Sequence, residues 1–212
     1  RPNAELISEE EELKRVIEPI KSIHRHFPEA ILSIDTFRSK VAEEAVLHGV
    51  SIINDISGGT EDEHIFKIAA KYTCPLILMH KQGTLQTMHK EKNYENLLTD
   101  ILDYFIVQTN KASDFGIKDV IIDVGFGFSK TIEQNYALLK NLNVFTQLEK
   151  PVIAGLSRKS MLYKTLNVTS ENALNATSIA NTIALQNGAS ILRVHDVKEA
   201  MECVQIWKMM NG

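Results

Sequence analysis

The sequence predicts an α/β fold built on a parallel sheet. Six short, β-rich apolar runs alternate with longer segments in which apolar residues recur with helical period. The runs are almost continuously apolar, which is typical of strands that are covered on both faces. The 212 residues are 44% hydrophobic and 24% charged, so the chain can bury a full core. We therefore expect one domain over residues 1–212.

Helix and strand signals alternate along the chain. A first helix is expected to begin after Ser8, where Glu11 completes a capping-box pattern. Six strand–helix units follow it. The expected strands are Ala30–Ile34, Ser51–Ile53, Pro75–Met79, Val120–Ile122, Pro151–Ala154 and Ser190–Val194. The expected helices after them are Ser39–His48, Glu63–Lys71, Tyr94–Phe115, Thr131–Asn141, Glu171–Gln186 and Val197–Met210. Thr131 and Gln134 form a second capping-box pattern.

Two architectures fit this order, an open doubly wound sheet and a (β/α)₈ TIM barrel. A barrel has eight strands and typically about 250 residues. This chain supplies six strand patterns and opens with a helix that has no strand before it. That order fits a barrel whose first strand–helix–strand is missing, so we expect an N-terminally incomplete (β/α)₈ barrel domain.

The composition excludes several classes of function. With 23 basic and 27 acidic residues the net charge is −4, which gives no general attraction for nucleic acid or for an anionic membrane surface. No apolar run approaches the roughly 20 residues of a membrane span, and the first residues show no leader pattern. Cys74 and Cys203 cannot form a disulfide framework and suit a reducing compartment. We expect a cytoplasmic protein that binds neither nucleic acid nor membrane.

Polar side chains follow every expected strand. They are Asp35 and Thr36, Asn54 and Asp55, His80, Asp123, the run Ser157 to Ser160, and Arg193 with His195 and Asp196. The carboxyl ends of parallel strands share one rim, where ligands bind in barrels and in open sheets alike. One polar residue at a strand end is often only a helix cap or a turn former. Six strands that all end this way predict a shared small-molecule site.

The chemistry of this set favours a phosphorylated heterocycle. Asp35, Asn54 and Asp123 offer the acceptors and the amide that match the edge of a heterocyclic ring. Lys159, Arg193 and His195 offer positive charge after the last two strands, where barrels often bind phosphate. Strand alternation predicts that residues 193 and 195 share one face and that residue 194 points to the other.

Read in order, these residues closely resemble dihydropteroate synthases of the folate pathway. The matching stretches are Ser33-Ile34-Asp35-Thr36, Ile53 to Gly59, Met79-His80-x-x-Gly83-Thr84, Asp123-x-Gly125-Phe126-Gly127-Phe128-x-Lys130-Thr131, Ser157-Arg158-Lys159-Ser160 and Arg193-Val194-His195-Asp196-Val197. They appear in the family's order and span nearly the whole chain. Val124 and Leu85 depart from the family's usual prolines, which affects loop stiffness more than chemistry.

The resemblance implies a (β/α)₈ barrel enzyme and a sulfonamide target. Such an enzyme joins 6-hydroxymethyl-7,8-dihydropterin pyrophosphate to p-aminobenzoate and releases pyrophosphate in the presence of Mg²⁺. By match, the pterin ligands are Asp35, Asn54, Asp123 and Lys159. The pyrophosphate ligands are Arg193 and His195. The p-aminobenzoate pocket is bordered by Arg1, Pro2, Phe128, Lys159 and Ser160.

The resemblance also implies which of these groups act on the reaction. Arg193, His195 and Mg²⁺ would neutralise the leaving pyrophosphate. Asp35 would stabilise the cation-like methylene, and Lys159 would serve both substrates. No metal ligand is assigned within the chain, because the family's Mg²⁺-associated loop belongs to a segment expected before Arg1. A homodimer is expected from the family alone.

Two other functions and several structural roles remain open. The first is a pterin-binding methyltransferase that acts on methyltetrahydrofolate and a corrinoid protein, and the second is a non-catalytic pterin-binding protein. Asp55 and Asp196 are expected to cap helices, and Asp35 could do the same. Arg158 is expected to form a structural ion pair. His80 is either a buried structural residue or part of the pocket.

Overall fold

The structure is a computed structural model that describes residues 5–84, 87–88, 90 and 93–212. Arg1 and Pro2, which were assigned to the p-aminobenzoate pocket, lie outside the described residues, as does Leu85. The chain divides into two compact units, the first formed by residues 1–79 and 107–121 and the second by residues 80–106 and 122–212. The expectation of a single domain stays a prediction.

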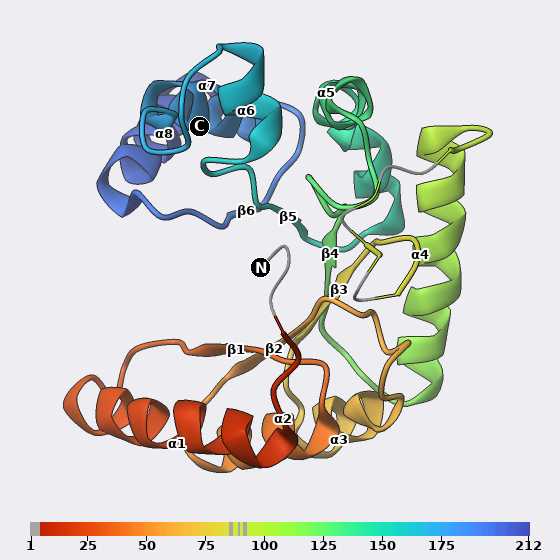
Figure 1. The fold of residues 1–212 in the computed structure, drawn as a ribbon, viewed down its shortest axis with the longest axis vertical. Coiled ribbons are helices and arrows are strands. Elements are labelled where there is room, and N and C mark those ends of the chain that lie inside the picture. Colours follow the sequence, from red (N-terminus) through yellow and green to blue (C-terminus); the bar gives the residue numbers. More distant parts are fainter. Residues whose placement is uncertain (1–4, 85–86, 89, 91–92) are drawn as a thin grey trace. The chain divides into compact units, whose positions relative to one another are not determined.

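The first unit is a parallel sheet covered by helices. Its elements are α1 (Glu9–His26), β1 (Ser33–Asp35), α2 (Ser39–Leu47), β2 (Ile52–Asp55), α3 (His64–Tyr72), β3 (Leu76–Met79), the end of α4 (Leu97–Asp114) and the start of β4 (Val120–Asp123). β1 pairs with β2 and β2 with β3, both in parallel. The helices α1, α2 and α3 lie on one side of these strands (Figure 1).

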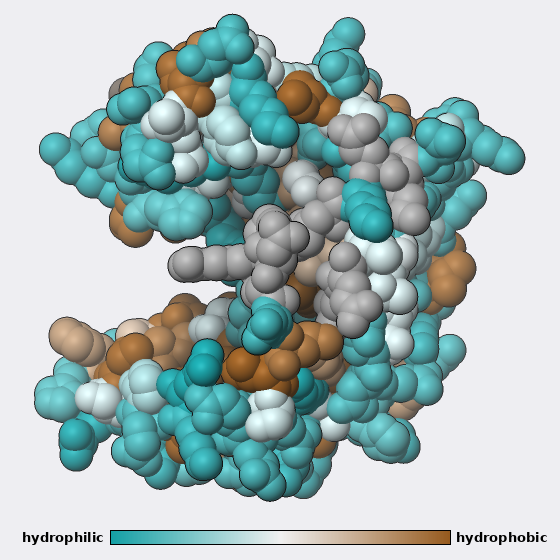
Figure 2. All heavy atoms as spheres, viewed as in Figure 1, coloured by the Kyte–Doolittle hydropathy of each residue, from teal (hydrophilic) through white to brown (hydrophobic). Residues whose placement is uncertain are grey.

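Helical periodicity explains how the first unit buries its core. In α2 the buried residues Val41, Ala42 and Ala45 recur at helical spacing, and α3 presents Ile65 and Phe66 in the same way. Figure 2 shows hydrophilic residues over the outer side of these helices and hydrophobic residues gathered toward the strands.

The second unit repeats this plan. Its elements are the start of α4, the end of β4, α5 (Ile132–Lys140), the 3₁₀ helix η1 (Leu142–Leu148), β5 (Val152–Ala154), α6 (Ser160–Thr165), α7 (Leu174–Gln186), β6 (Ile191–Leu192) and α8 (Val197–Asn211). β4 pairs with β5 and β5 with β6, again in parallel. Phe105 and Phe145 are fully buried and meet edge to face, with ring centroids 6.2 Å apart.

The predicted strand–helix order is confirmed, with shifted bounds. β1, β2 and β4 extend one or two residues further than predicted and end on Asp35, Asp55 and Asp123. The polar side chains at these ends are therefore held by the strands themselves and not by loops. Two short helices, η1 and α6, were not predicted, because six or seven residues are too few to show a helical period. No helix in the described part of the chain combines the length and apolarity that crossing a membrane requires.

One of the two predicted capping boxes is confirmed and the other is only half formed. Ser8 accepts a hydrogen bond from the backbone N–H of Glu11, 3.2 Å away, as predicted. The Glu11 carboxylate instead accepts a hydrogen bond from Arg15 Nε at 2.8 Å. A charged partner one turn along the helix thus replaces the reciprocal contact to the backbone.

The complete capping box at the start of α5 gives a stability prediction. The Thr131 hydroxyl accepts from the Gln134 N–H at 3.2 Å, and the Gln134 side chain accepts from the Thr131 N–H at 2.8 Å. Thr131→Ala should lower the free energy of unfolding by about 1 kcal/mol, whereas Thr131→Ser should preserve most of it. Denaturant unfolding of the two variants checks this. Equal stability of the alanine and serine variants would contradict it.

Candidate functional site

The turn after β4 is shaped by Asp123 and two glycines. The Asp123 carboxylate accepts a hydrogen bond from the Gly125 N–H at 2.8 Å. Gly125 has φ +70°, and a Cβ there would lie 2.0 Å from the His80 carbonyl oxygen. Only glycine fits so close to another backbone. The turn of residues 125–128 is therefore set by local backbone requirements, next to a buried carboxylate.

Lys130 lies beneath this turn, and its side chain is buried. Its ammonium donates to the carbonyl oxygens of Gly125 (3.1 Å) and Phe128 (3.0 Å) and lies 3.1 Å from His80 Nδ1. Burial lowers the pKa of Lys130 to about 7, while the nearby Asp123 carboxylate opposes that shift. No role was predicted for Lys130 from the sequence, where it is only part of a motif. The feature that could have indicated a role is its position directly after a glycine-rich turn.

His80 is the structural partner of Lys130. It is 3% exposed, and burial together with the Lys130 charge lowers the pKa of its imidazole to about 2. The ring is therefore neutral, and Nδ1 accepts the hydrogen bond from Lys130. Of the two roles left open for His80, the structure supports the buried structural one.

Lys159 lies at the start of α6 and reaches back to the same turn. Its ammonium donates to the Phe126 carbonyl oxygen and lies 4.9 Å from the centroid of the Phe128 ring. Burial lowers the pKa of Lys159 to about 8, Asp123 acts in the opposite direction, and Arg193 lowers it further. Ser160 is the first residue of α6. Four residues predicted for the pterin and p-aminobenzoate pockets (Asp123, Phe128, Lys159 and Ser160) thus belong to the second unit.

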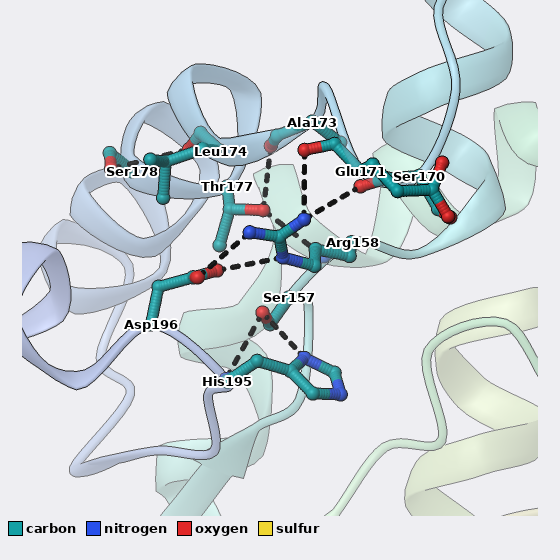
Figure 3. A network of polar contacts seen from close by, with 10 residues as sticks. All are labelled: Ser157, Arg158, Ser170, Glu171, Ala173, Leu174, Thr177, Ser178, His195 and Asp196. Carbon is teal, nitrogen blue, oxygen red and sulfur yellow. Dashed lines mark hydrogen bonds and ion pairs between the residues drawn. The ribbon is translucent and has the colours of Figure 1, made fainter.

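Arg158 fastens the loop before α6 to the loop before α8. Its guanidinium binds both oxygens of Asp196, at 2.9 and 2.8 Å, and also donates to the carbonyl oxygens of Ser170 and Glu171 (Figure 3). This confirms the expected ion pair. Asp196 precedes α8, but its side chain makes no capping hydrogen bond, because both oxygens are engaged by Arg158. Its expected capping role was wrong.

Ser157 fastens the same two loops one residue earlier. Its hydroxyl lies 2.9 Å from His195 Nδ1 and accepts from the His195 N–H at 3.3 Å (Figure 3). Its neighbours line a cavity of about 260 Å³ formed by Gly155, Ser157, Lys159, Arg193, Val194 and His195. Three cationic or proton-binding side chains therefore border one cavity.

The alternation predicted at residues 193–195 stays a prediction. β6 ends at Leu192, and the Arg193 N–H still donates to the Ala154 carbonyl oxygen of β5 at 3.0 Å. Arg193, Val194 and His195 all line the same cavity. A larger cavity of about 340 Å³ among α5, α6 and α7 is almost entirely apolar and contains none of the predicted site residues.

Asp35 and Asn54 belong to the first unit and are neighbours there. They are paired in register at the ends of β1 and β2. Asp35 is exposed and Asn54 is buried. The N-cap position of α2 is Arg38, not Asp35, and the N–H of Ser39 at the start of α2 donates to the Asp62 carboxylate at 2.8 Å. Asp55 is structural as expected, but its carboxylate accepts the N–H groups of Ser57 and Gly59 within a turn and caps no helix.

The arrangement in the second unit suits an anion beside an aromatic ligand. Lys159, Arg193 and His195 can share a phosphate or pyrophosphate, and Phe128 offers an aromatic surface at the same lysine. Among the described residues no group of three or more His, Cys, Asp or Glu side chains is arranged to hold a metal ion.

Comparison with known proteins identifies the family. A profile described as "Pterin binding enzyme" matches residues 1–195. The dihydropteroate synthase of Haemophilus influenzae is 39% identical over 98% of this chain and 76% of its own length. The chain belongs to the dihydropteroate synthase family of pterin-binding enzymes. Its activity is therefore that of a dihydropteroate synthase, a transferase of folate biosynthesis.

Solved structures of this family show the same fold. The Yersinia pestis dihydropteroate synthase in a sulfonamide drug complex matches with a TM-score of 0.94 at 36% identity, over 99% of this chain and 76% of that one. The Xanthomonas albilineans enzyme with 4-aminobenzoic acid matches with a TM-score of 0.92 at 31% identity, over 100% of this chain and 76% of that one. The predicted fold, part of a (β/α)₈ barrel, is confirmed.

Lys130 should make the free energy of unfolding depend on pH. Its pKa is about 7 in the folded chain against an ordinary 10.5, so between these values the unfolded chain binds more protons. The contribution of Lys130 to stability therefore rises with pH in this window, by at most about 1.4 kcal/mol per pH unit. We expect the unsubstituted chain to gain stability relative to Lys130→Met as pH rises from about 7 to about 9.

Denaturant unfolding of both proteins at several pH values measures this difference. His80, Asp123 and Lys159, the titratable groups nearest to Lys130, are present in both proteins. A stability difference that stays constant across the range would show that Lys130 is not depressed in pKa.

Arg158 should be irreplaceable by lysine. Lysine is a point charge and cannot bind both Asp196 oxygens and two carbonyl groups at once. Arg158→Lys should lower the midpoint of thermal unfolding, and adding Asp196→Asn should lower it by less than the sum of the two single changes. Arg25→Lys, on the exposed face of α1, is the matched control. Strict additivity of the two substitutions would mean that the ion pair contributes nothing.

Proposed function

We propose that the chain condenses 6-hydroxymethyl-7,8-dihydropterin pyrophosphate with p-aminobenzoate to give 7,8-dihydropteroate and pyrophosphate. The observation that carries the proposal is the convergence of Lys159, Arg193 and His195 on one cavity, with Phe128 beside Lys159, in a chain of this family. The relatives solved with 4-aminobenzoic acid and with a sulfonamide drug support the second substrate.

Arg193 and His195 are assigned to the leaving pyrophosphate. Cleavage of the carbon–oxygen bond places negative charge on the leaving group, and preorganised cationic donors stabilise charge as it develops. His195 can donate from its ring once Ser157 has fixed its orientation. Both residues are exposed in the second unit, which leaves a path for the released anion.

The pterin and its cation-like methylene are assigned to the residues that end the strands. By the resemblance to the family, Asn54 of the first unit and Asp123 and Lys159 of the second are the ligands of the ring edge, and Asn54 and Asp123 are each buried in their own unit. Asp35 stabilises the positive charge that appears on the methylene when pyrophosphate leaves. The aromatic amine is neutral at physiological pH, so its attack needs neither a strong base nor a covalent enzyme intermediate.

p-Aminobenzoate is assigned to Phe128, Lys159 and Ser160, with Arg1 and Pro2 as further contributors. The Phe128 ring supplies a face for the aromatic substrate, and the Lys159 ammonium supplies charge for its carboxylate. Arg1 and Pro2 lie outside the described residues, so their part rests on the family resemblance alone.

Mg²⁺, a homodimer and a cytoplasmic location complete the proposal and rest on the resemblance to the family. The described residues offer no cluster suited to Mg²⁺, so no step is assigned to the metal. Against the corrinoid-dependent methyltransferase, the anion cavity is the discriminating feature, because methyl transfer releases no pyrophosphate. The relatives named above are dihydropteroate synthases and favour the condensation.

Arg193→Gln tests the assignment. Removing a charged hydrogen-bond donor should weaken binding of inorganic pyrophosphate by roughly 10-fold or more and lower the rate of dihydropteroate formation. Arg15→Gln, on the exposed face of α1, is the matched control. Calorimetry with pyrophosphate and an assay of dihydropteroate formation measure the two effects. Unchanged pyrophosphate affinity in Arg193→Gln would sink the assignment, and the absence of dihydropteroate formation by the unsubstituted protein would sink the function.

A further inference from the structure

Lys130 carries a buried ammonium that donates hydrogen bonds to neutral acceptors. The acceptors are two carbonyl oxygens within one turn and the neutral ring of His80. Lys130 is 6% exposed, so its charge has lost nearly all contact with water. Burying an ammonium costs free energy, which its hydrogen bonds must offset. Here the hydrogen bonds of Lys130 hold the two ends of the Gly125–Phe128 turn, which an apolar side chain could not do.

That turn carries the groups that meet Lys159. The Phe126 carbonyl oxygen accepts from the Lys159 ammonium, and the Phe128 ring lies beside it. Gly127 packs so close that a Cβ there would be 3.3 Å from Lys159 Cδ. On its other side, the Gly127 N–H donates to the Asn135 side chain of α5 at 2.7 Å. The turn is therefore held from α5 and from Lys130, and it fixes where Phe128 and Lys159 stand.

We infer that Lys130 is a positioning residue for p-aminobenzoate, which acts through the Gly125–Phe128 turn and does not touch the substrate. This inference rests on the proposed function. Lysine suits the task because its three donors diverge from one atom and reach three acceptors. The guanidinium of arginine is wider and planar and cannot do the same in this space. Lys130 should therefore govern the affinity for p-aminobenzoate much more than the affinity for pyrophosphate, whose ligands lie on the loop after β6.

The experiment compares Lys130→Met and Lys130→Arg with Lys164→Met, a control on the exposed side of α6. KM for each substrate, kcat and the calorimetric affinity for inorganic pyrophosphate are measured for every variant. In Lys130→Met we expect KM for p-aminobenzoate to rise by about tenfold or more, with pyrophosphate affinity within about twofold of the unsubstituted enzyme. Lys130→Arg should not restore KM, and Lys164→Met should leave all values unchanged.

Two results would overturn the inference. One is a KM for p-aminobenzoate in Lys130→Met that stays within about twofold of the unsubstituted value, and the other is an equal loss for p-aminobenzoate and pyrophosphate, which marks general damage. If Lys130→Met does not fold, Lys130→Gln decides by the same two criteria, because it keeps a donor for one of the carbonyl groups. Dihydropteroate formation by the unsubstituted enzyme is established first, so failure of the proposed function is seen separately.

Discussion

The second unit is organised around the ammonium groups of two lysines, one buried and one half-buried, that lie near the same carboxylate. Lys130 and Lys159 both lie near Asp123, which raises the pKa of each while burial lowers it. The ammonium groups of both lysines donate hydrogen bonds to backbone carbonyl groups of the turn between them, so this turn supplies hydrogen-bond acceptors to both lysines. Gly125 and Gly127 let the chain of this turn pass close to His80 and Lys159.

A small number of side-chain contacts also holds the loops before α6 and α8. Arg158 and Ser157 join the loop before α6, which carries Lys159, to the loop before α8, which carries His195. Arg158 itself has φ +55°, an uncommon conformation for a side-chain-bearing residue that its bond to Asp196 and its N–H bond to Thr177 help to hold. Arg158 therefore has a structural role, and it helps to position the neighbouring Lys159.

The fold and the polar residues at the strand ends could be predicted from the sequence, but the contacts between loops could not. Asp35, Asn54 and Asp123 could be placed because strand ends of a parallel sheet are readable from apolar runs. The role of Lys130 could not be read, since its partners lie two to five residues away in a turn and 50 residues away at His80. The bounds of the last strand could not be predicted for the same reason. A strand was expected over Ser190–Val194 and β6 is Ile191–Leu192, because the end of β6 depends on pairing with β5 that a single apolar run does not reveal.

The exposed and buried charges of the second unit suit the two different tasks proposed for them. Arg193 and His195 are exposed, and a site that must release pyrophosphate in every cycle gains from contact with water, which weakens ionic binding. Lys159 is half-buried, and its ammonium donates to the Phe126 carbonyl oxygen of the turn. A less hydrated surface favours the aromatic amine proposed to lie there, because water would compete with it for the cation-like methylene. Lys159 and Arg193 would serve poorly if their exposure were reversed, since a buried pyrophosphate would leave slowly and a hydrated amine pocket would favour hydrolysis.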